Sequence, residues 1–286
     1  MVTRWSSLVL ALAGVSAWSC VSSPSAETGV AWRALARGMD LATIDGKTAG
    51  VAAGAKITVL RIDPAHWSLE IVGIGQTNES TGRTAKDWAH ARGLVATINA
   101  GMFDVDGVTH IGYLRTGDHA QDRRANRYQS LAAFDPRGGA ELPRFRIFDL
   151  DEPGVSLEAV LADFGSVVQN LRLVKRPGEN RWGPQTKRWS EAALGEDVAG
   201  RALFLFSRAP FTMHEWNQAL LTSGIGLVAA QHLEGGPKAQ LYVRVGGVEL
   251  DLFGDFESSV PPAEGNPSAW PVPNVLGVRP RGSPVE

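Results

Sequence analysis

The sequence has 286 residues, 44% of them hydrophobic and 20% charged, so it is long and apolar enough to bury one large core. Its formal net charge of -2 and the lack of any basic run longer than two residues argue against a nucleic-acid-binding protein. Nine tryptophans are typical both of a chain whose aromatic surfaces contact sugars and of one that buries them in its core.

The first twenty residues have the build of an export signal. Arg4 precedes a run of about ten apolar residues, which is too short to span a bilayer. Cys20 is the only cysteine, so no intramolecular disulfide can form, and the ending AWSC resembles a bacterial lipoprotein signal despite Trp18. We therefore expect a signal at 1–20, a flexible tether at 21–29 and an exported protein. The protein would be anchored to the envelope by a lipid on Cys20; the alternative is that it is periplasmic or secreted without an anchor.

Residues 55–74 alternate apolar and polar positions on both sides of the turn sequence DPAH, which predicts a β-hairpin. A short helix follows. It is opened by Thr84, with Asp87 three residues later, and stopped by Gly93.

Two further helices are predicted later in the chain. The first, over 156–165 with Ser156 as N-cap, carries four apolar side chains on one face: Leu157, Val160, Leu161 and Phe164. The second runs from Thr212, with Glu215 at the capping-box position, to Gly224.

Further segments are predicted to be strands because they are apolar or alternating and are bounded by turn residues: 94–103, 130–139, 145–150, 166–174, 201–207 and 227–236. Residues 239–253 predict a hairpin whose two glycines suit a primed turn.

Many strands, few helices and no strict βαβ alternation predict a single α+β domain built on a mixed, largely antiparallel sheet with a few short helices. A parallel, doubly wound fold is the weaker alternative. From Pro261 onward the chain is rich in proline, and we expect it to lie over the domain as an extended tail rather than to form an element.

Three segments place polar groups where a strand gives way to glycine: INAGMFDVDG at 98–107, QNLRLV at 169–174 with RWSEAALG at 188–195, and QHLEGG at 231–236. Taken singly, each is also what an ordinary turn looks like.

Together, and in this order, these motifs resemble the phosphodiester glycosidase family. The resemblance covers about residues 30–278, leaving 279–286 as a tail, and it is strongest at INAGMF and at HLEGG. It implies an exported hydrolase that cleaves a sugar-1-phosphodiester linkage, in the branch of the family associated with bacterial exopolysaccharide.

By this resemblance, three groups of residues fall on family motifs: Asn99, Gly101 and Phe103 on Asn-x-Gly-x-Phe; Arg188 and Gly195 on a motif that opens a strand; and Glu234, Gly235 and Gly236 on Asp-Gly-Gly. The sequence departs from the family in having Glu234 for the usual aspartate, and Pro237 and Lys238 where small hydroxyl residues are usual. An extra methylene moves a carboxylate by about a bond length, which can cost about a hundredfold in rate.

The chemistry of the reaction suggests roles for these residues. Glycosidases use two carboxylates, for which Glu234 and Asp104 are the candidates, with Asp106 as the alternative to Asp104. An anionic substrate favours a guanidinium, for which Arg188 comes first. The other predicted substrate-binding residues are Asn99, Gly101, Phe103, His110, Arg115, Gln169, Arg172, His232, Gly235 and Gly236. His232 lies two residues before Glu234, so it should lie on the same side of the strand and could orient the acid.

Two other functions fit the same residues. One is a surface carbohydrate-binding or polysaccharide-assembly protein that has lost turnover, suggested by Glu234 and Pro237-Lys238. The other is a metal-dependent phosphodiesterase that cuts the phosphorus–oxygen bond. The sequence requires no cofactor and does not exclude a divalent metal. The expected partner is a sugar-phosphate diester or polysaccharide, with no nucleic acid, and the oligomeric state is left open.

Overall fold

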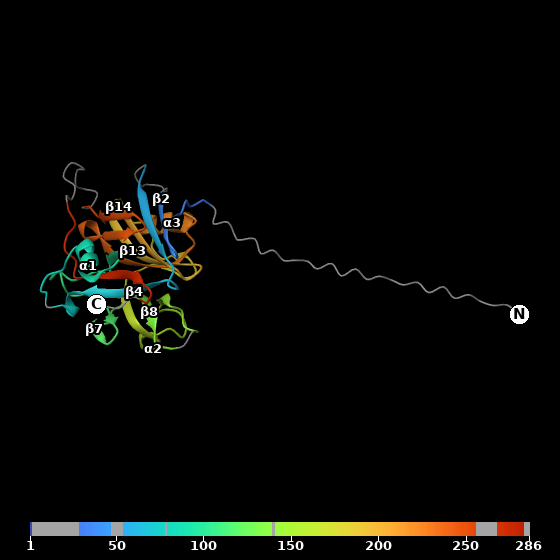
Figure 1. Cartoon of the computed structure of the whole chain (residues 1–286), viewed down its shortest axis with the longest axis horizontal. Coiled ribbons are helices and arrows are strands. Elements are labelled where there is room, and N and C mark those ends of the chain that lie inside the picture. The colour runs from blue at the N-terminus through green and yellow to red at the C-terminus, as the bar shows by residue number, and fades with distance from the viewer. Residues whose placement is uncertain (2–28, 47–53, 78, 139–140, 256–267, 283–286) are drawn as a thin grey trace.

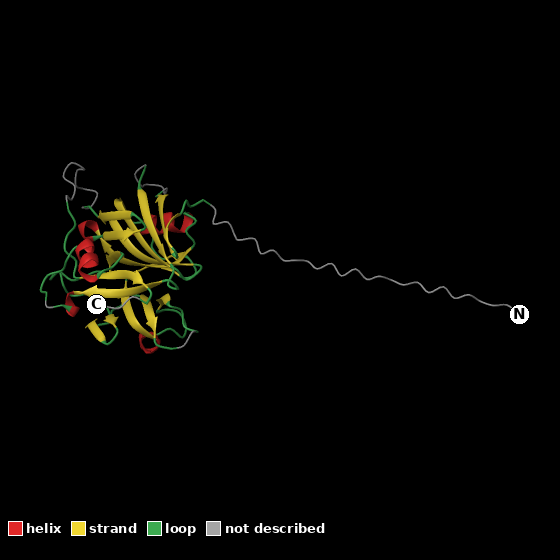
Figure 2. Ribbon diagram, in the orientation of Figure 1, coloured by secondary structure: helices red, strands yellow, loops and turns green. Residues whose placement is uncertain are grey.

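The computed structural model describes Met1 and residues 29–46, 54–77, 79–138, 141–255 and 268–282. The predicted export signal, Cys20 and most of the predicted tether lie outside these residues. The strands form three sheets, and every pair of neighbouring strands in them is antiparallel. The predicted α+β class is confirmed (Figures 1 and 2).

The large sheet has eight strands. In spatial order they are β1 (Arg33–Ala36), β2 (Met39–Asp45), β3 (Lys56–Ile62), β14 (Ala202–Phe211), β13 (Trp189–Asp197), β15 (Leu227–Gly235), β11 (Arg172–Lys175) and β12 (Glu179–Asn180). β13 and β15 lie side by side near the middle of this sheet, where both edges of each are paired.

Two five-stranded sheets complete the fold. The β8 sheet has the order β7 (His119–Asp122), β6 (Leu114–Thr116), β10 (Phe164–Asn170), β8 (Ser130–Pro136) and β9 (Phe145–Asp149). The β5 sheet has the order β17 (Val248–Phe253), β16 (Gln240–Val245), β5 (Ala96–Asn99), β18 (Asn274–Pro280) and β4 (Trp67–Gly73). In Figure 1 the labelled strands of the large sheet lie at the top, β4 in the middle, and β7 and β8 at the bottom.

Each sheet has one helix against its outer face. α1 (Ala85–Arg92) packs on the β5 sheet, α2 (Leu157–Asp163) on the β8 sheet and α3 (Met213–Thr222) on the large sheet. The inner faces of all three sheets meet in one apolar core, to which β3, β5, β8, β14 and β18 all contribute. None of the described helices combines the length and the apolar composition needed to cross a bilayer.

The three predicted helices and their N-caps are confirmed, but the second ends at Asp163, so Phe164, predicted on its apolar face, begins β10 instead. Thr84, Ser156 and Thr212 each accept a hydrogen bond from the first turn, and Thr212 and Glu215 form a full capping box. The predicted hairpin of β16 and β17 is also confirmed, with positive φ at both turn glycines, as a primed turn requires.

Three predictions about the strands were wrong. β3 and β4 do not pair with each other, because β3 lies between β2 and β14 while β4 pairs with β18 in another sheet. Residues 166–174 are not one strand, since the chain leaves the β8 sheet at Asn170 and enters the large sheet at Arg172. The proline-rich tail contributes β18, an inner strand that pairs with β5 on one edge and β4 on the other and buries its apolar residues 275, 276 and 278.

Candidate functional site

The strand that carries Glu234 ends at a cavity of about 380 Å³. Its lining is Trp189, His232, Glu234, Gly235, Gly236, Pro237, Lys238 and Trp270. β15 supplies the acid, and the short 3-10 helix η2 (Gly236–Lys238) turns the chain away immediately afterwards. Two tryptophans therefore share the lining with a carboxylate, an imidazole and an ammonium group, and Trp270 is 40% exposed.

A register shift in the pairing of β13 with β15 shapes this end of the strand. Ala193 faces His232 and Ala192 faces Glu234, so Leu233 is an extra residue on β15. Such bulges redirect side chains and are frequent beside active sites. His232 and Glu234 thus line the same cavity, although the simple alternation from which we predicted this does not continue through Leu233.

A buried carboxylate that sequence reasoning missed supports His232. Glu191 on β13 is fully buried, and its Oε2 lies 2.8 Å from His232 Nδ1. Its other oxygen accepts a hydrogen bond of 2.6 Å from the indole N–H of Trp189. Both carboxylate oxygens are therefore engaged, and the imidazole is held in a fixed orientation. The available signal was a glutamate within the otherwise apolar strand sequence SEAALG.

The environment shifts the pKa values of His232 and Glu234 in the cavity wall. Burial opposes the charged form of His232, but the attraction of Glu191, with that of Glu234, outweighs it and raises the pKa of the imidazole above its usual 6.5; burial also raises the pKa of the Glu191 carboxyl. Burial raises the pKa of Glu234 above its usual 4.5, against the lowering influence of His232, the Gly235 N–H and Lys238. Perturbed acids and bases that line a cavity are typical of functional sites.

Glycine is required at each of the two positions after Glu234 for a different structural reason. A Cβ on Gly235 would lie 2.4 Å from Cδ1 of Trp189, so only glycine lets the indole pack against this backbone. Gly236 has φ +64°, a left-handed conformation that opens η2. The pair therefore fixes both the tryptophan wall and the turn that follows the acid.

Asn99, at the end of β5, holds this turn from the other side. Its Nδ2 donates to the carbonyl of Lys238 at 2.6 Å, and its Oδ1 accepts from the N–H of Gln240 at 2.7 Å. The Lys238 ammonium lies 4.2 Å from the ring centre of Phe103. Asn99 and Phe103, which precede Glu234 by 135 and 131 residues, are thus brought to the site, where they position the η2 turn and Lys238.

Gly101 and His110 form a buried support next to Phe103. A Cβ on Gly101 would lie 2.3 Å from Oδ1 of Asn170 and 2.5 Å from Cε1 of His110. His110 is 2% exposed and forms a β-bridge with Phe103. Burial lowers the pKa of its imidazole to about 4, so His110 is neutral at physiological pH. Neither residue lines the cavity.

The predicted arginines lie elsewhere and have protein partners. Arg188 forms an ion pair with Glu215 of the α3 capping box. Arg115 donates to three carbonyls at the end of α2, among them those of residues 161 and 165. Arg172 forms ion pairs with Asp149 and Asp151. None of the three lines the cavity, and Lys238 is the cation that does.

The remaining predicted residues also have structural partners. Asp104 accepts from the N–H of Val105, and Asp106 accepts from Thr109, so both carboxylates order an exposed loop. The side chain of Gln169, which is fully buried, bonds the backbone of residues 113, 126 and 128. Within the described residues, the second carboxylate next to the cavity is that of Glu191 rather than Asp104.

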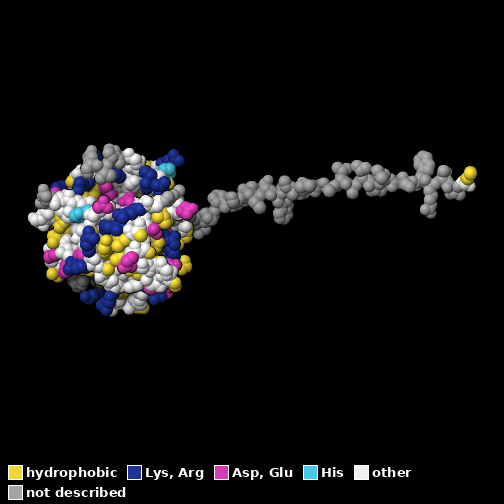
Figure 3. Space-filling model, turned by 90° about the horizontal axis from the view of Figure 1, so that it is seen from below, with side chains coloured by type: hydrophobic (Ala, Val, Ile, Leu, Met, Phe, Trp, Pro, Cys, Tyr) yellow, Lys and Arg dark blue, Asp and Glu magenta, His cyan; other side chains and the backbone are white. Residues whose placement is uncertain are grey.

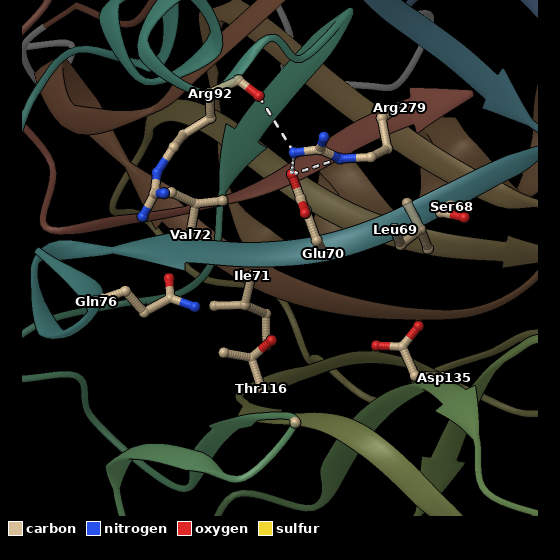
Figure 4. A pocket seen from close by; sticks show the side chains of 11 residues that line it. Ser68, Leu69, Glu70, Ile71, Val72, Gln76, Arg92, Thr116, Asp135 and Arg279 are labelled. Atoms are coloured by element: carbon tan, nitrogen blue, oxygen red, sulfur yellow. Dashed lines mark hydrogen bonds and ion pairs between the residues drawn. The ribbon is translucent and has the colours of Figure 1, made fainter. Parts of the chain in front are cut away.

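Another cavity, of about 340 Å³, lies along the free edge of β4 (Figure 4). Glu70 points from β4 to Arg279, which bonds it at 2.6 Å, and Asp135 lies on the opposite side of the strand. Asp135 accepts a hydrogen bond from Ser166. This cavity contains none of the predicted site residues, and two of its four charged residues, Glu70 and Arg279, are paired with each other.

Acidic and basic side chains are interspersed on the face of the molecule in Figure 3. Among the described residues, no three histidine, cysteine, aspartate or glutamate side chains gather in an arrangement that could hold a metal ion.

Comparison with known proteins identifies a family for most of the described domain. Residues 92–279 match the family model described as phosphodiester glycosidase, a range that includes Asn99, Glu191 and Glu234. No curated protein matches the sequence.

Two solved structures share the fold. One is the catalytic domain of zebrafish N-acetylglucosamine-1-phosphodiester alpha-N-acetylglucosaminidase, auto-inhibited by its pro-peptide; it matches with a TM-score of 0.61 and 14% identity, covering 85% of this chain and 84% of that one. The other is a hypothetical protein from Synechocystis, with a TM-score of 0.58 and 16% identity, covering 90% of this chain and 64% of that one.

Proposed function

The chain belongs to the phosphodiester glycosidase family, and from this we propose that it hydrolyses the bond between an anomeric carbon and a phosphodiester oxygen in an envelope or extracellular glycan. The observation that carries the proposal is the cavity at the end of β15. There, Glu234 and His232, which is paired with Glu191, line one cavity together with Lys238, Trp189 and Trp270.

Each lining group has a part in this reaction. The Lys238 ammonium offsets the negative charge of the phosphodiester, and Trp189 and Trp270 offer apolar faces to the sugar. Glu234 accepts a proton from the attacking water while the oxygen of that water bonds to the anomeric carbon. The bond from that carbon to the phosphate oxygen breaks, and the electron pair leaves with the phosphate.

His232 donates a proton to the leaving group. Its Nδ1 is engaged by Glu191, and within the described residues its Nε2 has no hydrogen-bond partner, so Nε2–H can donate to the departing oxygen. This proton neutralises the negative charge that develops on the departing phosphate oxygen as the bond breaks. The products are a free sugar and a phosphomonoester.

Hydrolysis of a methyl diester of a sugar 1-phosphate in ¹⁸O-labelled water tests the proposal. Cleavage at the anomeric carbon places the label in the free sugar, whereas cleavage at phosphorus places it in the phosphate. Label in phosphate, with activity lost to a chelator, would support the metal-dependent phosphodiesterase instead. Glycan binding with no labelled product would support the non-catalytic alternative.

The rate should depend on pH as a bell-shaped curve. Activity requires Glu234 as carboxylate and His232 as imidazolium, so kcat/KM should rise with pH through the raised pKa of Glu234 and fall through that of His232. The acidic limb should therefore lie above pH 4.5 and the basic limb above pH 6.5. A His232→Gln variant should lose the basic limb, and a limb that persists would assign it to another group.

We also propose that the protein acts outside the cytoplasm, anchored by a lipid on Cys20, as the N-terminal sequence suggests. Wild-type protein should incorporate labelled palmitate and sediment with membranes, and Cys20→Ser should do neither. Labelling of the serine variant at the wild-type level would contradict the anchor.

A further inference from the structure

A further cavity, of about 230 Å³, lies beside the proposed site on the side of β11. The carbonyl of Leu171, which lines it, accepts a hydrogen bond of 2.8 Å from the N–H of His232. β11 and β15 are neighbours in the large sheet, and neighbouring strands lie about 4.8 Å apart. The walls of the two cavities therefore meet along the β11–β15 pair.

An indole ring held in place forms one wall of this cavity, which we call the β11 cavity. The Trp182 ring N–H donates to the carbonyl of Arg172 at 2.8 Å, and its backbone N–H donates to Oδ1 of Asn180 at 3.0 Å. Asn180 in turn donates to the carbonyl of His214 on α3. Because this platform is ordered without a ligand, binding to it costs little conformational entropy.

Three guanidinium groups line the β11 cavity, and they retain free donors. Arg127 is exposed and its side chain has no partner within the described residues. Arg172 meets Asp149 and Asp151 through Nη1 alone. Arg181 meets the exposed Glu179, also through Nη1. The remaining N–H groups can bind an oxyanion, and the planar guanidinium fork suits a carboxylate or phosphate.

We propose that the β11 cavity is a subsite for an acidic sugar unit of the glycan whose phosphodiester occupies the cavity that Glu234 lines at the end of β15. The tryptophan offers an apolar face to the ring, while the arginines bind its carboxylate or phosphate group. The inference rests on the proposed function for the cleavage step and narrows its substrate class to polyanionic glycans. Acid recognition itself can be measured without catalysis.

Titration calorimetry tests the subsite with three probes: a glucuronate-containing oligosaccharide, the same oligosaccharide with its carboxyl groups reduced, and inorganic phosphate. Wild-type protein should bind the acidic oligosaccharide about tenfold more tightly than the reduced one, as one or two charged hydrogen bonds provide. Arg127→Ala should remove most of this preference. Arg33→Ala, which deletes an exposed arginine on β1 outside both cavities, should leave it unchanged.

Kinetics separate this inference from the proposed function. For a sugar 1-phosphodiester extended by glucuronate, Arg127→Ala should raise KM about tenfold and leave kcat unchanged, while the methyl diester should be hydrolysed at the wild-type rate. Equal binding of acidic and reduced oligosaccharides, or of inorganic phosphate and the acidic oligosaccharide, would overturn the subsite even if hydrolysis is observed. Acid-selective binding that is lost in Arg127→Ala, without any hydrolysis, would support the subsite and refute the enzyme.

Discussion

Glu234→Gln is expected to lower kcat/KM for a sugar 1-phosphodiester by about 100- to 10,000-fold, the usual contribution of a general acid or base. Glutamine has nearly the same shape and can still accept the hydrogen bond that Gly235 N–H gives to Oε1, so the fold should be retained. It cannot accept the proton of the attacking water. Initial rates of sugar release, together with a thermal unfolding curve, measure both effects.

Two further variants sharpen this result. Glu152→Gln removes an exposed carboxylate that lines neither cavity and should leave the rate unchanged. Glu234→Asp restores the residue usual in the family, but it withdraws the carboxylate by about a bond length from a cavity built around glutamate, at a cost of about a hundredfold. Equal rates for wild type and Glu234→Gln would remove Glu234 from the mechanism.

Local signals in the sequence predicted the helices and most strands, because caps, alternation and turn residues act within a few positions. Thr212 with Glu215 and the Gly246-Gly247 turn are of this kind. Which strands pair is decided by contacts between distant residues. The turn between β3 and β4 looks the same whether the chain folds back or crosses to another sheet, and here it crosses.

The residues of the candidate site also fall into those that local sequence predicts and those that depend on distant contacts. Glu234 and its glycines could be predicted because strand, acid and turn are contiguous, and the family resemblance added Asn99. Glu191 could not be assigned, since a buried glutamate is explained only by its partner His232, which lies 41 positions later in the chain. Arg188 matched the chemistry expected of an anion site, yet the capping box of α3 provides Glu215 as its partner.

Glu191→Gln is expected to alter both stability and the pH profile. Its single amide oxygen can accept from the Trp189 indole or from His232, but cannot replace both carboxylate contacts, so the free energy of unfolding should fall by about 1–3 kcal/mol.

The loss should depend on pH with a definite sign. The raised pKa of His232 contributes stability that is fully present below its unfolded pKa of about 6.5 and is lost as the pH rises through the folded value. The difference in unfolding free energy between wild type and Glu191→Gln, measured in urea, should therefore shrink above neutral pH.

For the same reason the basic limb of the rate profile of Glu191→Gln should move to lower pH, because the imidazolium has lost its counter-charge. Glu196→Gln, at a buried glutamate of the same strand paired with Arg176, should destabilise the fold but leave that limb in place. A limb that stays in place in Glu191→Gln would show that Glu191 only supports the strand and does not position His232 for proton transfer.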